Sequence, residues 1–232
     1  MKWISQIVAW LVLCAPAYAA PPGGVQASYE VFSSGMKIGQ IDETYTRNND
    51  HYTLTSTTTP LGLLAVFKPE KVFLSSSGLV EKQGLRPQHF EDKRAGNPGK
   101  SSQADFDWLT QQLTLIHQAQ RMQLALPEGT QDRLSAMYQF MFLRLDNVAT
   151  LDFSMTNGNK LDSYHYAIGA RQKIDTPAGK FDSRYLDSQG KPGESRTEIW
   201  LETQHNLPCK MIITDANGDQ FMQILSGLKI IP

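Results

Sequence analysis

The sequence has few cysteines and no closely spaced histidines. These absences argue against an internal disulfide and against a metal site. Its 232 residues include two cysteines, Cys14 and Cys209. Cys14 falls in a predicted signal peptide, so the mature chain cannot form an internal disulfide, and we expect Cys209 to be buried. The five histidines lack the i, i+2 or i, i+4 pairs that commonly build a metal site. We therefore predict no metal and no cofactor.

Positive and negative charges are nearly balanced. Lysine and arginine number 22, against 23 aspartate and glutamate residues, and the net charge is −1. Proteins that bind nucleic acids or anionic membrane surfaces usually carry a basic excess. The composition therefore predicts neither kind of partner.

Catalytic motifs are absent or incomplete. No Gly-x-Ser-x-Gly elbow and no Cys-x-x-Cys pair occurs. Two Ser-x-x-Lys matches, Ser34–Lys37 and Ser188–Lys191, fall in glycine-containing turns. Gly96–Ser101 lacks the first glycine of a phosphate-binding loop, and Asp215–Asp219 lacks the glutamate that completes an EF-hand loop. The pattern favours a non-enzymatic protein, although dispersed carboxylates and histidines can still converge in a fold.

No apolar run reaches membrane-spanning length. The N-terminal stretch Ile7–Cys14 is far shorter than the ~20 residues that cross a bilayer. It follows the basic Lys2 and precedes Ala17-Tyr18-Ala19, which is the order of a cleavable secretory signal peptide. We predict cleavage after Ala19, with no transmembrane anchor in the mature chain.

The predicted organisation is a signal peptide over residues 1–19 and a single β-rich domain over 20–232. This predicts export to the periplasm. An outer-membrane lipoprotein is the alternative, because Cys14 ends the apolar run. The residue before a lipidated cysteine should be small, and Leu13 is not, so the sequence favours the cleaved form.

Most of the chain has the pattern of short strands separated by turns. Val25, Ala27 and Tyr29 alternate with polar residues, as in a strand with one buried face. Gly39 lies at a shift in the apolar phase, which predicts a β-bulge, and Asn217-Gly218 is the strongest hairpin signal. We expect strands over 25–31, 37–46, 52–58, 71–75, 79–82, 106–108, 113–116, 122–126, 151–155, 164–168, 172–176, 181–186, 197–202, 208–214 and 220–225.

Three connecting segments are predicted from composition. Ser77-Gly78 predicts a hairpin turn. Phe90–Ser102 combines charge with turn-forming residues and predicts a mobile surface loop. Leu61–Phe67, which lies between two prolines, predicts an apolar connection.

One segment has a helical period, because its apolar residues recur at spacings of three and four. These residues are Leu134, Met137, Tyr138, Met141 and Leu145. Thr130 is the expected N-cap, and Asp132 lies in the first turn, where negative charge suits the helix dipole. Together the patterns predict a mainly β fold: a large curled antiparallel sheet, half-barrel or barrel-like, with one packed α-helix.

The candidate ligand site is aromatic and rich in methionine. Trp108 and Trp200 lie in predicted strands, where an aromatic side chain most often fills a core. If the sheet curls around a cavity, these side chains, Met137 and Met141 line a pocket for an apolar ligand instead. Asp132-Arg133 at the helix start forms a structural ion pair or cap, or binds an anionic group.

Several sequence elements, in order along nearly the whole mature chain, resemble those of one family. They are Gly84-Leu85-Arg86-Pro87-Gln88-His89-Phe90, Phe106-Asp107-Trp108, Gln131-Asp132-Arg133-Leu134-Ser135, Thr176-Pro177-Ala178-Gly179-Lys180-Phe181, Trp200-Leu201 and Leu207-Pro208. The family is the exported bacterial domain of unknown function family 3108. The resemblance implies the periplasm of a Gram-negative envelope and supplies no catalytic residues. The final hairpin also resembles the curled half-barrel sheets of periplasmic lipoprotein and lipid carriers.

Two functions follow as expectations. The first is a non-enzymatic periplasmic binding or accessory protein that holds an apolar or amphipathic, lipid-like ligand in its curled sheet. The second is an envelope scaffold that docks a protein partner through its sheet edges and the Phe90–Ser102 segment, without a small-molecule ligand.

Overall fold

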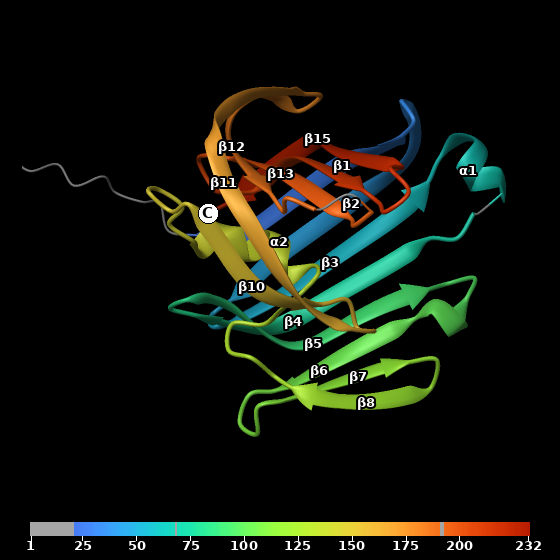
Figure 1. Cartoon of the computed structure of the whole chain (residues 1–232), viewed down its shortest axis with the longest axis vertical. Helices are drawn as coiled ribbons and strands as arrows, with labels where there is room; N and C mark the ends of the chain where they lie inside the picture. Colours follow the sequence, from blue (N-terminus) through green and yellow to red (C-terminus); the bar gives the residue numbers. More distant parts are fainter. Residues whose placement is uncertain (1–20, 68, 191–192) are drawn as a thin grey trace, which may run out of the picture.

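The computed structural model describes residues 21–67, 69–190 and 193–232. The predicted signal peptide and Cys14 lie outside the described residues. The described chain forms one sheet of 15 strands, which curls without closing (Figure 1). This confirms the predicted mainly β, curled-sheet fold.

The first half of the chain builds one side of the sheet, from its centre to one edge. Its strands are β1 (Gly24–Ser33), β2 (Met36–Asn48), β3 (His51–Pro60), β4 (Val72–Glu81), β5 (Gly84–Arg94), β6 (Ser102–Asp107), β7 (Gln112–His117) and β8 (Gln120–Ala125). Two short helices interrupt it, α1 (Gly62–Phe67) and the 3-10 turn η1 (Pro98–Lys100).

The second half runs from the opposite edge back to the centre, where β15 pairs with β1. Its elements are β9 (Gln131–Asp132), α2 (Ser135–Gln139), the 3-10 turn η2 (Phe140–Phe142), β10 (Thr150–Thr156), β11 (Leu161–Thr176), β12 (Gly179–Asp187), β13 (Arg196–Glu202), β14 (Pro208–Thr214) and β15 (Gln220–Ile231). All neighbouring strands pair antiparallel except β9 and β10, which pair parallel.

The connection between the two sheet edges requires the sheet to curl. β8 and β9 are the opposite edges of the strand order, yet only residues 126–130 join them. Laid flat, the sheet would span roughly 65 Å at about 4.8 Å per strand, whereas a link of this length reaches at most about 22 Å. Edge strand β9 therefore returns over the concave face, where the Gln131 side-chain amide donates to the Leu85 carbonyl of β5 at 2.9 Å.

Helix α2 is the predicted packed helix, and it lies against the concave face (Figure 1). Tyr138 stacks on Tyr45 of β2, with ring centroids 5.8 Å apart. The predicted cap at Thr130 is wrong, because its hydroxyl donates to the Pro127 carbonyl at 2.7 Å. The Asp132 carboxylate caps the helix instead, accepting the N–H groups of Leu134 and Ser135 at 2.9 and 2.8 Å.

The predicted hairpin at Ser77-Gly78 is wrong, because β4 continues through both residues. The strand register shifts there and leaves an extra residue, Gln88, on β5. A Cβ atom on Gly78 would lie 2.2 Å from the Arg86 carbonyl oxygen. Glycine is therefore needed for the close approach of two strands, and it does not mark a turn.

The predicted loop over Phe90–Ser102 is also largely wrong. β5 continues to Arg94 and β6 begins at Ser102, so only residues 95–101 connect the two strands. Phe90 and Asp92 face the interior and are buried. The alternation of a strand is present in this segment, but its outward-facing charged residues obscure it. The apolar connection predicted over Leu61–Phe67 contains α1.

Other local predictions are confirmed. The register of β1 and β2 shifts opposite Gly39, as the apolar phase indicated. Asn217-Gly218 forms the turn of the β14–β15 hairpin, with Gly218 at φ +88. Cys209 is fully buried. No helix among the described residues has the length and apolarity to cross a membrane.

Candidate functional site

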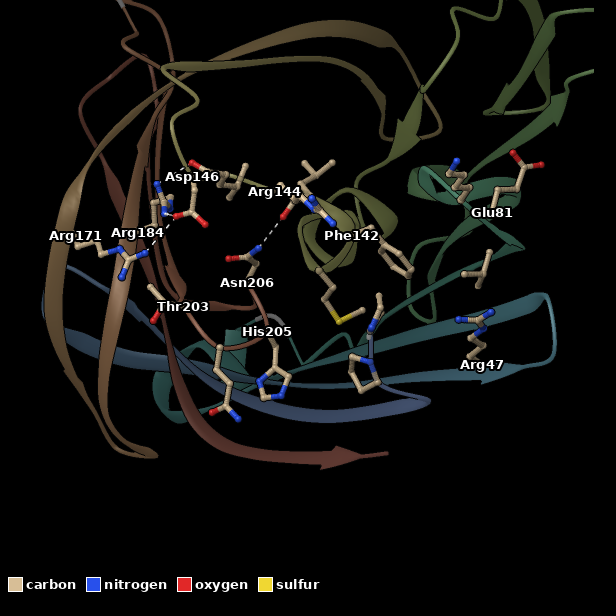
Figure 2. Close-up of a pocket in the computed structure, with 18 residues that line it drawn as sticks. Arg47, Glu81, Phe142, Arg144, Asp146, Arg171, Arg184, Thr203, His205 and Asn206 are labelled. Atoms are coloured by element: carbon tan, nitrogen blue, oxygen red, sulfur yellow. Dashed lines mark hydrogen bonds and ion pairs between the residues drawn. The ribbon is translucent and has the colours of Figure 1, made fainter. Parts of the chain in front are cut away.

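A cleft of about 600 Å³ opens where several turns meet (Figure 2). Its walls come from the segment before β1, the ends of β2 and β4, the β4–β5 turn, η2 and the loop after it, strands β11 and β12, and the β13–β14 turn. These segments are far apart in the sequence, and the curled sheet brings them together. A volume of this size is typical of small-molecule sites.

Basic side chains outnumber acidic ones in the cleft. The lining contains two acidic residues, Glu81 and Asp146. Its lysine and arginine residues are Arg47, Lys82, Arg144, Arg171 and Arg184. A cleft lined mainly by one sign of charge concentrates ligands of the opposite sign.

The Asp146 carboxylate forms ion pairs with two of these arginines. Its Oδ1 atom lies 2.5 Å from Arg184 Nη2 and 3.2 Å from Arg171 Nη2 (Figure 2). Arg184 also donates to the Leu145 carbonyl at 2.8 Å, so it is held in one orientation. The side of the cleft formed by Arg171 and Arg184 is therefore held in place, with the Asp146 carboxylate shared by two guanidinium groups.

The opposite side of the cleft carries Arg47 and Lys82 (Figure 2 labels Arg47). Glu81 is nearby, but its carboxylate pairs with Arg86, outside the lining, at 2.9 Å. Arg47 Nε donates to the Asn49 carbonyl at 2.7 Å. Among the described residues, neither Arg47 nor Lys82 has a carboxylate within ion-pair distance. Their charge is available to a ligand.

The rest of the lining is largely apolar. Met141, Phe142 and Leu143 of the η2 segment and Val80 of β4 contribute side chains. Met141 is one of the four residues predicted to contact a ligand. Cationic and apolar groups on one surface suit an amphipathic molecule with an anionic head group.

The β13–β14 turn is built around a buried carboxylate. Glu202 accepts the N–H groups of Gln204, His205 and Leu207 at 2.8, 2.7 and 3.2 Å. Asn206, at φ +56, donates to the Leu143 carbonyl at 3.0 Å. These contacts present His205 and Asn206 to the cleft (Figure 2). No local motif in the sequence indicated this role.

The two predicted tryptophans lie apart from the cleft. Trp108 stacks on Phe106, and its indole N–H donates to the Pro87 carbonyl at 2.6 Å. The Trp200 indole N–H donates to Gln172 Oε1 at 2.8 Å, with Lys210 over the ring at 4.8 Å. Ile199 and Leu201 pack in a different cluster from Trp200, on the other face of β13, as the alternation predicted.

The third predicted contact residue, Met137 of α2, packs against both core clusters. It is not part of the cleft lining. Of the four predicted ligand residues, the structure therefore brings one, Met141, into the cleft. A role for the other three in ligand binding stays a prediction.

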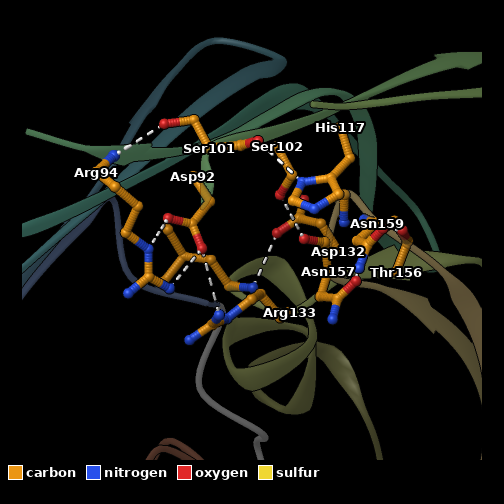
Figure 3. A network of polar contacts seen from close by, with 12 residues as sticks. Asp92, Arg94, Ser101, Ser102, His117, Asp132, Arg133, Thr156, Asn157 and Asn159 are labelled. Atoms are coloured by element: carbon orange, nitrogen blue, oxygen red, sulfur yellow. Dashed lines mark hydrogen bonds and ion pairs between the residues drawn. The ribbon is translucent and has the colours of Figure 1, made fainter. Parts of the chain in front are cut away.

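The side chains of Asp132 and Arg133 bind different partners. The Asp132 carboxylate caps α2 and accepts the Ser76 hydroxyl at 2.5 Å. Arg133 approaches Asp92 at 3.6 Å, and Arg94 holds the same carboxylate at 2.8 Å (Figure 3). Asp92 thus lies between two guanidinium groups. Arg133 keeps 42% of its side chain exposed, and anion binding there stays a prediction.

A second polar group inside the curl centres on Glu43 of β2. Tyr138 and Ser56 donate to its two carboxylate oxygens at 3.1 and 3.2 Å. Burial raises the pKa of Glu43 to about 7, and these hydrogen bonds oppose the rise. No cluster of three or more metal-ligating side chains occurs among the described residues.

Comparisons with known proteins agree with this architecture. The family described as "Protein of unknown function (DUF3108)" matches residues 28–225. The chain belongs to this family. The predicted resemblance is confirmed.

A solved structure gives an independent view of the fold of this DUF3108 chain. It is the beta-barrel-like protein of domain of unknown function DUF1849 from Brucella abortus, with a TM-score of 0.59 and 12% sequence identity. The match covers 91% of this chain and 99% of that chain, and it supports the fold alone. No curated protein matches the chain.

The elements that carried the DUF3108 resemblance hold the scaffold together. Arg86 pairs with Glu81, Trp108 binds the β5 backbone, and Asp132 caps α2. None of the elements contributes to the cleft lining. Membership of the family therefore does not indicate whether the cleft binds a ligand, and the cleft must be interpreted from its own side chains.

Proposed function

We propose that this protein is a non-enzymatic binding protein of the Gram-negative periplasm that holds an amphipathic, lipid-like ligand with an anionic head group. The N-terminal signal-peptide pattern supports the location. The observation that carries the ligand class is the pair Arg47 and Lys82, which share the cleft with apolar side chains and have no carboxylate partner among the described residues.

The head group is held by the side of the cleft that carries Arg47 and Lys82. Glu81 and Asp146 do not neutralise this side, because their carboxylates bind Arg86 in one case and Arg184 and Arg171 in the other. A phosphate or carboxylate there gains charge-assisted hydrogen bonds. Its apolar part then covers Met141, Phe142 and Leu143.

Titration calorimetry on the mature protein tests the proposal with dodecyl phosphate and uncharged dodecyl maltoside. We expect the phosphate to bind more tightly. The double variant Arg47→Gln/Lys82→Gln should weaken that binding by about tenfold or more, because each lost charged contact is worth more than 1 kcal/mol. Equal affinity of the two amphiphiles would contradict an anionic head group.

A charge-matched control separates the cleft from general electrostatics. Lys93→Gln/Lys180→Gln removes the same charge from side chains that are 65% and 85% exposed and do not line the cleft. This variant should bind dodecyl phosphate like the wild type. If both double variants weakened binding equally, the effect would come from overall charge and the cleft would not be the binding site.

An alternative function is an envelope scaffold that binds a protein by strand addition. One observation favours it: β8 is an edge of the sheet, and nearly all its residues are exposed, with Met122 51% exposed. A photo-crosslinker at Met122 should then capture one reproducible partner in cells, and Gln123→Pro should abolish the capture. If no partner were crosslinked at Met122, this function would be ruled out for β8.

A further inference from the structure

Helix α2 covers only part of the concave face of the sheet. Residues that pair across β1 to β6 beneath Tyr138 form one row of side chains on this face, and all of them are buried: Val25, Tyr45, Leu54, Ser76, Phe90 and Ala104. A second row lies four residues away along β2 to β5, roughly 13 Å toward α1. Its members are all partly exposed: Ile41, Thr58, Val72 and Arg94. Solvent therefore reaches the concave face beyond the helix.

Arg133, which precedes α2, lies between these two rows, beside Asp92 (Figure 3). Its Nη1 atom is 3.6 Å from Asp92 Oδ2, which is longer than a hydrogen bond. Among the described residues, no acceptor lies within hydrogen-bond distance of the Arg133 guanidinium group. Burial lowers the pKa of Arg133, yet 42% of its side chain is exposed. Arg133 is therefore a cation that the protein surrounds, that solvent reaches and whose donors are available to a ligand.

The carboxylates near Arg133 are already engaged or mainly uncharged. Asp92 accepts two hydrogen bonds from Arg94, from Nε at 2.8 Å and from Nη2 at 3.0 Å. Asp132 is turned toward the start of α2. Glu43 lies in the same row as Asp92, but burial raises its pKa to about 7, so it is mainly uncharged at pH 6. On the side that solvent reaches, two guanidinium groups therefore share one charged carboxylate.

We infer that this cluster is a binding site for an alkyl carboxylate, whose carboxylate accepts hydrogen bonds from Arg133 and whose chain covers Ile41 and Val72. A guanidinium group presents two parallel donors that match a planar carboxylate. A single negative charge also suits the one unmatched guanidinium group, whereas a doubly charged phosphate would place surplus charge beside Asp92. Ile41 and Val72 pack against the core and keep part of their surface exposed. None of these residues lines the cleft, so the site is independent of the proposed function.

Titration calorimetry at pH 6 tests the site with decanoate and 1-decanol, which has the same chain length and no charge. The protein is the mature Arg47→Gln/Lys82→Gln variant, because decanoate can also enter the cleft of the wild type. We expect decanoate to bind about tenfold more tightly than 1-decanol, as for one hydrogen bond between charged groups. Adding Arg133→Gln should remove this preference. Equal affinities of the two compounds before that change, or an unchanged preference after it, would overturn the inference.

Matched variants locate the carboxylate. Lys93→Gln removes a positive charge from the opposite face of β5, where the side chain is 65% exposed, and should leave decanoate binding unchanged. Val72→Asp puts a carboxylate opposite Arg94 on the concave face and should abolish binding. Phe73→Asp, at an outward-facing residue that is 41% exposed, should not.

Two outcomes would place the carboxylate elsewhere and contradict the inference. One is a loss of affinity in Lys93→Gln equal to that in Arg133→Gln, and the other is decanoate binding retained in Val72→Asp. The proposed function is judged separately, by the effect of Arg47→Gln/Lys82→Gln on dodecyl phosphate binding. Failure of this inference is thereby distinguished from failure of the proposed function.

Discussion

The phenol group of Tyr138 on α2 donates a hydrogen bond to the Glu43 carboxylate of β2 at 3.1 Å. The contact joins the helix to the concave face of the sheet across 95 positions of sequence. Tyr45, stacked on Tyr138, packs beside it. The fold therefore places an ionisable group at the contact between its helix and its sheet, and stability should respond to the charge of that group.

Glu43→Gln should flatten the pH dependence of stability. Burial raises the folded-state pKa of Glu43 from 4.5 to about 7. The folded state thus holds the proton more tightly, and this stabilisation is complete below pH ~4.5 and lost as pH rises to about 7. From pH 5 to 8, urea unfolding of the wild type should lose about 1 to 3 kcal/mol more than that of Glu43→Gln. Exposed Glu128→Gln is the control, and superimposable wild-type and Glu43→Gln profiles would refute the prediction.

Asp132→Ala should destabilise the protein by about 2 to 4 kcal/mol, because it removes the cap of α2 and one of the two hydrogen-bond partners of the buried Ser76 hydroxyl. Asp132→Asn keeps an acceptor oxygen and should cost less. Urea unfolding measures both. Asp175→Ala, at a side chain that is 74% exposed, should change stability by less than about 0.5 kcal/mol. A similarly small effect of Asp132→Ala would show that the cap is not important.

Gly78→Ala should be strongly destabilising, because its Cβ atom would lie 2.2 Å from a backbone oxygen of the neighbouring strand. We expect a loss of about 2 to 4 kcal/mol in thermal or urea unfolding. Gly99→Ala is the matched control, since its Cβ atom would meet only Asn97 Oδ1 at 3.5 Å. Equal effects of the two changes would contradict the close-approach explanation.

Binding of dodecyl phosphate should weaken with salt, because the groups proposed to hold its head group are cationic. Raising ionic strength from about 0.05 to 0.5 M shortens the Debye length about threefold, so it screens these charges and should lower the affinity. Dodecyl maltoside should show no such loss. A salt-independent affinity for the phosphate would mean that the apolar lining alone binds it.

Cys209 should resist thiol reagents in the folded protein. It is fully buried, and burial raises its pKa to about 12. Iodoacetamide at pH 8 should label it only after unfolding in urea, as measured by intact mass. Rapid labelling of the native protein would show that the strand pair β13–β14 opens readily.

Local sequence signals predicted much of this fold, and their failures have physical causes. The alternation of Val25, Ala27 and Tyr29 gave β1, and Asn217-Gly218 gave the last hairpin. Gly78 was misassigned to a turn because a glycine needed for close strand approach looks the same in sequence as a turn glycine. Phe90–Ser102 was misassigned because charge on the outer face of β5 resembles loop composition.

The cleft could not be predicted from local patterns. Arg47, Lys82, Arg184 and His205 come from four separate segments, and none belongs to a recognisable motif. Their proximity depends on the curl of the sheet, which depends in turn on the short link between β8 and β9. Met141 was predicted because helical spacing alone identified the apolar face of the α2–η2 segment.

The pairing of β1 with β15 also has a consequence for the order of assembly. Gly24 pairs with Ile231, so the centre of the sheet joins its first strand in sequence, β1, to its last, β15. The strands on each side of this pair bond mainly with their sequence neighbours and can form early. The β1–β15 pairing cannot form until the last strand, β15, has been synthesised. Disruption of the β1–β15 pairing should therefore affect the last steps of folding more than the first.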